Sequence, residues 1–262
     1  MKKHIRKYYE QLYQGQKPVK AYGLGGKPLA VELGYPVGLI GSLPDEIWEN
    51  FLPCGYVLHY LHPKPGDRVL NLGCGAGIDS IILRLSVGAE FRMVNLDSAI
   101  PALIKACALA GRSFPGLEFE FVGADGSRLP FGPGSFDWII LNGVLNLFPE
   151  KAELIVELYR VLKRDGVLAG ADLCRRVILP DYFASEPDAW AWCMSGALSQ
   201  TELSAAFEAG GFAKLAQITE NMDEYFDRTV FAFRKRTCRE KLGQESLLQN
   251  VWQACEQTDL FS

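Results

Sequence analysis

The sequence lacks several features that mark whole classes of protein. None of its apolar runs approaches the ~20 residues that a membrane-spanning helix needs, and its first residues, MKKHIRKYYEQ, lack the apolar core of a signal peptide. A basic excess is also missing, because 27 Lys and Arg stand against 31 Asp and Glu, a formal net charge of −4. These absences predict a cytoplasmic protein that binds neither nucleic acid nor a membrane.

Residues in metal-ligand spacing are scarce as well. The seven cysteines are spread along the chain without a CxxC motif, and only three histidines occur. His59 and His62 are three residues apart but have no accompanying cluster of carboxylates or cysteines, so we expect no metal site there. An odd number of scattered cysteines is typical of free thiols in a reducing compartment.

What the sequence does contain is a regular alternation of short apolar strands and helices. Strands are predicted at residues 68–72, 91–96, 117–122, 136–141 and 167–171, and helices at 78–85, 101–110 and 150–162. Two further strands, 215–219 and 229–233, follow a helix that opens at the capping box Ser199-Gln200-Thr201-Glu202 and runs to Ala209. Repeated β-α units of this length predict an α/β fold with a parallel sheet covered by helices on both faces.

The rest of the chain differs in composition from this core. We divide the sequence into an N-terminal arm or lid (1–52), a core (53–180), a cap segment (181–198), the remainder of the sheet domain (199–237) and a C-terminal helical tail (238–262). The first thirty residues hold seven Lys and Arg and one acid, which fits either a solvated arm or a lid that draws anionic ligands to a cleft. The segment 23–44 is rich in Gly and Pro, which predicts a loop, and the tail has one apolar helical face that we expect to pack on the domain.

A glycine-rich loop, Gly73-Cys74-Gly75-Ala76-Gly77, joins the first core strand to the first core helix. Backbone N–H groups at such a helix start face a ligand, and glycine permits the ligand to approach the main chain closely. The loop lacks the third glycine of the dinucleotide fingerprint in either register. That disfavours a nicotinamide-dependent oxidoreductase and suits a nucleoside without a pyrophosphate.

Polar residues follow the next three strands. Asp97 ends the second strand, Asp125 follows the third, and Asn142 follows the fourth. Open α/β sheets bind ligands at the carboxyl ends of their strands, where a carboxylate in the position of Asp97 accepts the hydroxyls of a ribose. Any one of these residues alone is typical of a turn or a helix cap, but their occurrence at successive strand ends indicates a binding site.

In these motifs the sequence resembles the class I S-adenosylmethionine-dependent methyltransferases. The matching stretches are VLNLGCGAG (69–77), VNLD (94–97), GAD (123–125), LPFGPGSFDWIILN (129–142) and ELYRVLKRDGVL (157–168). The resemblance implies a Rossmann-like, doubly wound seven-stranded sheet with an antiparallel last strand, S-adenosyl-L-methionine as cofactor and a small-molecule methyl acceptor. It leaves the oligomeric state open, a homodimer included. The cofactor-binding residues that it implies are Asn71, Gly73, Cys74, Gly75, Asp97, Ser98, Asp125, Gly126 and Asn142. At position 71 the family usually has Asp or Glu.

Within the superfamily the chain is most similar to the arsenite methyltransferase branch, through LPCGYVLHYLHPKPGDRVLNLGCGAGIDS (52–80), LNGVLNL (141–147) and AWCMSGALSQTEL (191–203). That branch typically offers three cysteine thiolates to trivalent arsenic. Here Cys193 fills one position, Gly143 replaces another, and no cysteine precedes Cys54, which matches a different cysteine of the family. Asn142 and Cys193 are therefore our candidates near the acceptor.

Three interpretations follow for the chemistry. The cleft-forming loops contain no His that would act as a base, which favours a small acceptor that is already nucleophilic, such as a thiolate, a soft element or an activated carbon. Arsenite methylation is one alternative. A protein that binds S-adenosylmethionine without catalysis is another, and it is kept open by Asn71 and Gly143.

Overall fold

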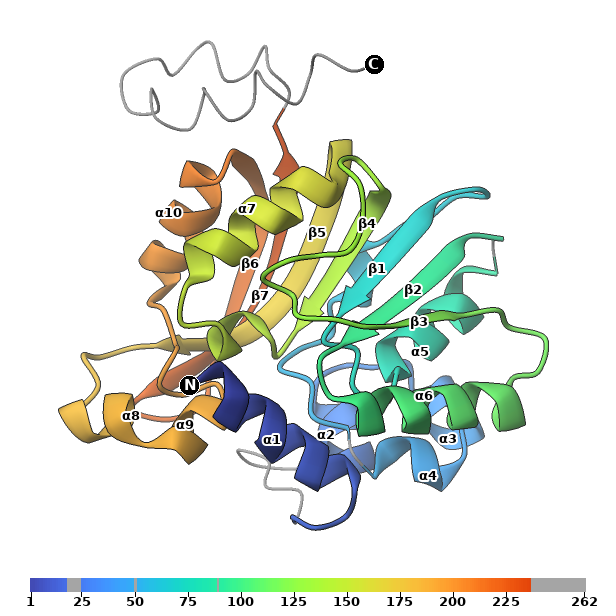
Figure 1. Cartoon of the computed structure of the whole chain (residues 1–262), viewed down its shortest axis with the longest axis horizontal. Helices are drawn as coiled ribbons and strands as arrows, with labels where there is room; N and C mark the ends of the chain where they lie inside the picture. The colour runs from blue at the N-terminus through green and yellow to red at the C-terminus, as the bar shows by residue number, and fades with distance from the viewer. Residues whose placement is uncertain (18–24, 50, 89, 237–262) are drawn as a thin grey trace.

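The structure is a computed structural model that describes residues 1–17, 25–49, 51–88 and 90–236. A seven-stranded sheet of order β3-β2-β1-β4-β5-β7-β6 forms its centre (Figure 1). The strands are β1 (Arg68–Leu72), β2 (Arg92–Asp97), β3 (Glu120–Gly123), β4 (Phe136–Asn142), β5 (Leu162–Arg175), β6 (Phe212–Asn221) and β7 (Phe226–Lys235). The first five pair in parallel, and β7 runs antiparallel to both β5 and β6. The predicted fold class, with its antiparallel last strand, is confirmed.

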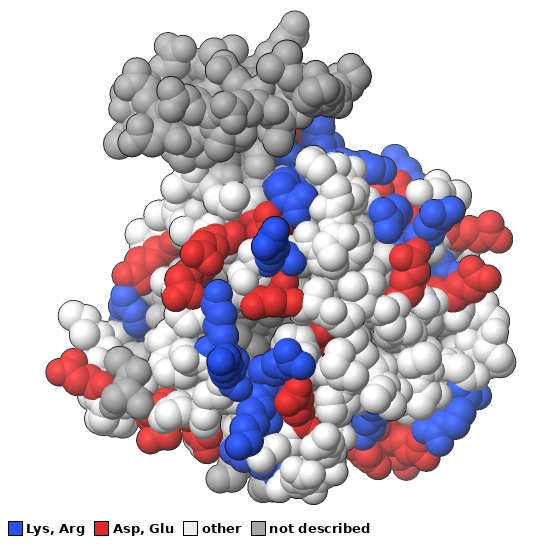
Figure 2. Space-filling view, viewed as in Figure 1, with Lys and Arg blue, Asp and Glu red and all other residues white. Residues whose placement is uncertain are grey.

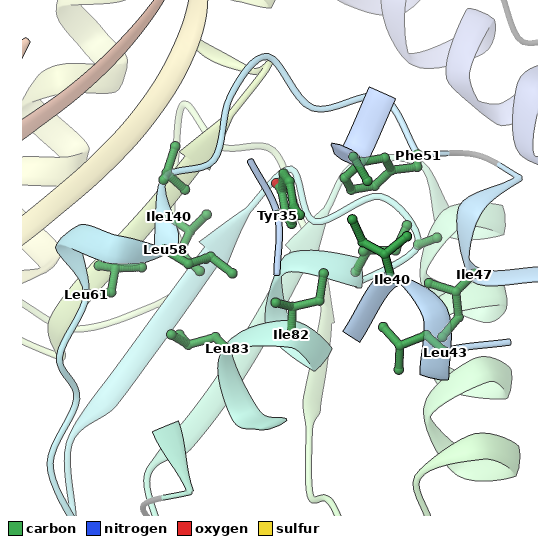
Figure 3. Packing of buried hydrophobic residues seen from close by; sticks show 14 of the residues in the cluster. Tyr35, Ile40, Leu43, Ile47, Phe51, Leu58, Leu61, Ile82, Leu83 and Ile140 are labelled. Carbon is green, nitrogen blue, oxygen red and sulfur yellow. The ribbon is translucent and has the colours of Figure 1, made fainter. Parts of the chain in front are cut away.

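Two hydrophobic clusters cover the two faces of this sheet. Successive residues of β1 point to opposite faces, so Val69 joins one cluster and Leu70 the other. The first cluster packs the N-terminal helices and α5 against the sheet; Figure 3 shows its buried residues around Tyr35 and Ile82. The second packs α7 and α10 on the other face. The helices of the core are α5 (Ile78–Val87), α6 (Ile100–Ser113), α7 (Lys151–Val161) and α10 (Gln200–Ala209).

The N-terminal segment contains more helix than its composition suggests. The prediction of a loop over residues 23–44 is wrong, because α2 (Gly26–Glu32) and α3 (Val37–Ser42) lie there, followed by α4 (Asp45–Trp48). Pro28 stands in the first turn of α2, and Pro36 and Pro44 directly precede α3 and α4. The backbone N–H groups in the first turn of a helix have no acceptor within the helix. Proline, which lacks this N–H, is therefore tolerated at these positions and does not break the helix.

The basic N-terminus is a docked helix. Helix α1 (Lys2–Tyr13) buries Ile5, Tyr8 and Leu12 and packs against α6 and α9 (Pro187–Ala191) below the carboxyl ends of the parallel strands (Figure 1). Trp192 Nε1 donates a hydrogen bond to Tyr8 Oη at 2.8 Å, which joins α1 to the cap segment. Of the two interpretations of this segment, the solvated arm is wrong. The cap itself comprises α8 (Asp181–Ser185) and α9.

Smaller differences concern strand boundaries. Residues 163–166, which separate the predicted helix 150–162 from the predicted strand 167–171, form an irregularity inside β5. There Phe136 pairs with Leu162 but Trp138 pairs with Val167, and Asp165 has a φ of 59°. The third strand begins at Glu120 and not at the predicted residue 117, because the Leu117 N–H donates a hydrogen bond to Phe114 O in a turn. The predicted C-terminal helical tail lies outside the described residues. No helix within the described part of the chain combines the length and the hydrophobicity that crossing a bilayer requires.

The predicted capping box offers a test of the fold. Ser199 Oγ accepts a hydrogen bond from Glu202 N at 3.2 Å, and Glu202 Oε2 accepts one from Ser199 N at 2.7 Å. We expect Ser199→Ala to lower the free energy of unfolding by about 1 kcal/mol, since an N–H at the start of α10 loses its acceptor. Urea denaturation measures the change. The exposed neighbour Thr201→Ala serves as control, and equal stability of the two variants would contradict the assignment.

Candidate functional site

The loop between β1 and α5 depends on its glycines. Gly73, Gly75 and Gly77 have φ values of 68°, 53° and 78°, in the left-handed region that other residues avoid. A Cβ at Gly75 would lie 2.4 Å from the hydroxyl oxygen of Tyr13, to which the backbone N–H of Ala76 donates a hydrogen bond. Tyr13 of α1 therefore lies directly over the loop, and its burial raises the pKa of its hydroxyl.

This loop forms one wall of a cavity of about 380 Å³ at the carboxyl edge of the sheet. The other walls come from the ends of β2, β3 and β4 and from Tyr9 and Tyr13 of α1. All the residues predicted to bind the cofactor line it: Asn71, Gly73, Cys74, Gly75, Asp97, Ser98, Asp125, Gly126 and Asn142. The sequence thus identified the cavity correctly, whereas each residue's contact with a cofactor stays a prediction.

Lysine and arginine side chains gather around the hollow on the face that carries α1 (Figure 2). Lys2, Lys3 and Arg6 of α1 line the cavity. Lys2 forms ion pairs with Glu150 and Glu153, and Arg6 pairs with Glu10 within the helix. The basic N-terminus therefore lines the cavity, and its role as a lid stays a prediction.

Asp97 connects the end of β2 to the glycine loop. Its Oδ2 accepts a hydrogen bond from Gly75 N at 2.9 Å, and its Oδ1 accepts one from Ala99 N at 2.9 Å. Burial raises the pKa of this carboxyl, while these N–H donors oppose the rise. Each carboxylate oxygen has two acceptor directions, so the group fixes the loop and keeps acceptor capacity for a ligand. Asp125 is less constrained: its Oδ1 accepts from the N–H and the hydroxyl of Ser127 in a turn.

Two asparagines use their side chains for internal hydrogen bonds. Asn71 Nδ2 donates to Ser80 Oγ at 2.9 Å, and Ser80 in turn donates to Asn95 Oδ1 at 2.6 Å, which fastens α5 to β1 and β2. Asn142 Oδ1 accepts from Cys54 N, and its Nδ2 donates to Gly55 O, each at 2.9 Å. Both residues line the cavity, but these contacts give their side chains a positioning role.

A second cavity, of about 80 Å³, adjoins the first. Both are lined by Tyr9, Leu52, Pro53 and Gly143, and the smaller one adds Cys54, Cys193, Trp192 and Met222 among others. Cys193 Sγ lies 3.4 Å from the carbonyl oxygen of Gly143. A hydrogen bond with the Cys54 thiol, together with burial, raises the pKa of Cys193 well above its ordinary value. Two thiols from distant parts of the sequence thus meet beside the larger cavity.

A buried carboxylate accompanies these thiols. Asp172 lies in β5, and its Oδ1 is 4.0 Å from Cys54 Sγ. It accepts hydrogen bonds from Asn146 N at 3.0 Å, from Asn146 Nδ2 at 2.9 Å and from Leu173 N at 2.9 Å. Burial raises the pKa of Asp172 to about 6 against the opposing effect of these donors.

The third thiol in this part of the sheet belongs to the core. Cys174 of β5 is buried in the second hydrophobic cluster and lines neither cavity. Its burial raises the pKa of its thiol to about 12. Cys174 is therefore no candidate ligand for an acceptor in either cavity. Within the described residues no group of three or more Cys, His, Asp or Glu is arranged to hold a metal ion.

Sequence reasoning missed several residues that the cavities bring together. Tyr9 and Tyr13 were visible only as aromatics in a basic segment, and they become cavity walls because α1 docks. Asp79 lines the larger cavity, but an acid in the first turn of a helix is also what helix stability favours. Nothing in the neighbouring sequence distinguishes an acid that lines a cavity from one that only stabilises the start of a helix.

Comparison with known proteins agrees with this geometry. The family model described as "Methyltransferase domain" matches residues 63–211. An arsenite methyltransferase of Halobacterium salinarum is 32% identical over 181 residues, 69% of this chain and 46% of that protein. A human arsenite methyltransferase is 24% identical over 242 residues, 85% of this chain and 60% of that protein. The chain thus spans about half to three fifths of the length of these curated relatives.

A solved structure shares the fold over a similar extent. It is CrArsM, an arsenic(III) S-adenosylmethionine methyltransferase from Chlamydomonas reinhardtii, with a TM-score of 0.63 and 25% identity, covering 75% of this chain and 71% of that one. The family model covers more than half of the 262 residues. The chain therefore belongs to the methyltransferase domain family, as a class I, S-adenosylmethionine-dependent member that resembles the arsenite methyltransferases.

Proposed function

We propose that this protein transfers the methyl group of S-adenosylmethionine to a small, soft acceptor bound beside Cys54 and Cys193. The observation that carries the proposal is the junction at Gly143. This glycine lines both cavities, with the glycine loop on one side and the two thiols on the other. A cofactor in the larger cavity and an acceptor in the smaller one would meet there.

The polar groups that line the larger cavity suit the parts of S-adenosylmethionine. The glycine loop offers backbone N–H groups without side chains in the way, Asp97 keeps acceptor capacity suited to ribose hydroxyls, and Asp125 lies at the next strand end. The bound cofactor supplies a methyl group on a sulfonium, which becomes a neutral thioether when the methyl group leaves. The chain's own residues supply position and a site from which water is excluded.

The smaller cavity favours a particular kind of acceptor. It is lined by aromatic and apolar side chains, by two thiols and by Arg228, which forms an ion pair with Glu32, and at about 80 Å³ it holds only a small group. Thiols are ligands for soft, polarisable elements. Asp172, with its pKa raised to about 6, lies beside the thiols as a proton acceptor when a thiol proton is displaced.

Arsenite is the second candidate acceptor, and the names of the relatives favour it. The number of thiols argues against arsenite. Trivalent arsenic is soft, and a site with three thiolates both captures and orients it, whereas the smaller cavity has two thiols. Position 143 offers no side chain, although a Cβ there would lie 3.4 Å from Cys54 Sγ. We therefore propose that arsenite is a poor substrate of this chain.

The first prediction from the proposed function concerns Asp97. Asp97→Ala removes a two-point acceptor for the cofactor, and we expect S-adenosylmethionine to bind more weakly by roughly 2–3 kcal/mol. Isothermal titration calorimetry measures the change, and Asp97→Asn, which keeps one acceptor, should show an intermediate loss. Unchanged affinity in folded Asp97→Ala protein would contradict the role. If the wild type binds the cofactor but forms no S-adenosylhomocysteine with any acceptor of a metabolite panel, a non-catalytic binding protein is the better interpretation.

The second prediction concerns the α1 lid. Tyr9 lines both cavities and Tyr13 covers the glycine loop, so deleting residues 1–20 opens the acceptor side to water. We expect turnover to fall by about tenfold or more, with a smaller loss of cofactor affinity. Lys7→Ala, at an exposed position of the same helix, is the control. Full activity of the truncated protein would show that α1 plays no part in the reaction.

The third prediction tests the arsenic interpretation. With arsenite, a thiol reductant and S-adenosylmethionine, we expect little methylarsenic from the wild type. Gly143→Cys adds a thiol beside Cys54 and should raise the rate by about tenfold or more, despite the strain of a side chain at a φ of 69°. Cys193→Ser should abolish that gain. Robust arsenite methylation by the wild type that Cys193→Ser loses would instead make arsenite the substrate.

A further inference from the structure

Asp79 is a buried carboxylate on the wall of the larger cavity. It lies in the first turn of α5, with 9% of its surface exposed. Its Oδ1 accepts a hydrogen bond from Tyr35 Oη at 2.6 Å, and its Oδ2 accepts one from Asn142 Nδ2 at 2.9 Å. Both donors are neutral. Among the described residues, no Lys, Arg or His forms an ion pair with Asp79.

A buried carboxylate such as that of Asp79 destabilises the folded protein unless another group offsets its negative charge. A buried charge without a counter-charge is strongly disfavoured, even when neutral donors bond to it. The start of α5 contributes a favourable dipole, but that effect amounts to only about 0.3–1 kcal/mol at exposed positions and falls off within one turn. The group is oriented by two hydrogen bonds toward a cavity, which suggests that a ligand supplies the missing positive charge.

The position of Asp79 identifies one end of the cavity. Asp97 and Asp125 lie at the ends of β2 and β3, whereas Asp79 is bonded to Asn142 at the end of β4. Asn142 Oδ1 accepts from the N–H of Cys54, one of the two thiols of the smaller cavity. With the ribose at Asp97, the remainder of the cofactor extends toward Asp79 and the thiols. That remainder carries the two positive charges of S-adenosylmethionine, the sulfonium and the α-ammonium, and one α-carboxylate, so its net charge is positive.

We propose that Asp79 is the counter-charge for the cationic half of S-adenosylmethionine in this protein, a specificity residue that favours the charged cofactor over uncharged adenosine compounds. The proposal rests on the proposed function, because it takes S-adenosylmethionine as the occupant of the larger cavity. Tyr35 and Asn142 act as positioning residues that hold the carboxylate in place.

The assignment has a consequence for pH. Burial raises the pKa of Asp79, opposed by the hydrogen bonds from Tyr35 and Asn142, and the titratable groups that face it are Tyr35 and Tyr56, both neutral near pH 7. A cationic ligand favours the ionised carboxylate. Below the raised pKa, binding must therefore release a proton, and the affinity for S-adenosylmethionine falls as the pH falls. A neutral ligand carries no such linkage.

The experiment compares two ligands by calorimetry on the full chain: S-adenosylmethionine and 5′-methylthioadenosine. The second ligand keeps the adenosine, has a neutral thioether in place of the sulfonium, and lacks the charged amino-acid group. Asp79→Asn preserves the shape of the side chain. We expect it to lower the affinity for S-adenosylmethionine about tenfold or more, and the affinity for 5′-methylthioadenosine less than about twofold. The wild type should lose S-adenosylmethionine affinity on acidification, and Asp79→Asn should show a flatter profile.

Tyr35→Phe is the matched variant that keeps the charge. It removes a hydrogen bond to the ionised form, so the midpoint of the pH profile should move to higher pH. Equal losses for both ligands in Asp79→Asn, or an unchanged affinity for S-adenosylmethionine, would overturn the proposal. If Asp79→Asn does not fold, an unmoved midpoint in Tyr35→Phe overturns it instead. A wild type that binds no S-adenosylmethionine would refute the proposed function itself, and that result is distinct from the others.

Discussion

The parallel alignment of five strands is the constraint on which the whole site depends. Because β3, β2, β1, β4 and β5 run in the same direction, their carboxyl ends reach a single edge of the sheet. The ladder fixes their relative positions: Gly143 N donates to Ala171 O at 2.8 Å, and Gly73 N donates to Leu96 O at 2.7 Å. The glycine loop and the residues that follow β2, β3 and β4 are brought together by main-chain hydrogen bonds before any side chain contributes.

The N-terminal segment closes this edge through polar contacts as well as apolar ones. Asn142 bonds to Cys54, Gly55 and Asp79, so it joins the end of β4, the chain before β1 and the start of α5. Fully bonded buried networks of this kind define one arrangement of the elements that they connect. This network sets the position of the Cys54 thiol relative to the glycine loop. Tyr35, which lies near the network, is packed in the first hydrophobic cluster (Figure 3).

The sequence predicted the sheet, its antiparallel last strand and the cavity wall because those features follow from local periodicity and from the directions of the strands. It failed at α2 and α3, where Pro28 and Pro36 stand at the starts of short helices that bury Leu29, Ala30 and Ile40 in the first hydrophobic cluster. It also could not show that Cys54 and Cys193 meet, or that Asn142 Oδ1 accepts a hydrogen bond from Cys54 N. Those arrangements depend on tertiary contacts between segments far apart in the chain.

The burial of Cys193 has a consequence for the chemical durability of the protein. Thiolates, and not thiols, react with peroxide and alkylating agents. Since its hydrogen bond with Cys54 and its burial keep the pKa of Cys193 well above its ordinary value, almost none of this residue is ionised at neutral pH. A low thiolate fraction and a buried position both disfavour the sulfenic and sulfinic oxidation that is typical of exposed, acidic cysteines, and they favour reagents whose affinity for sulfur is high enough to displace the proton.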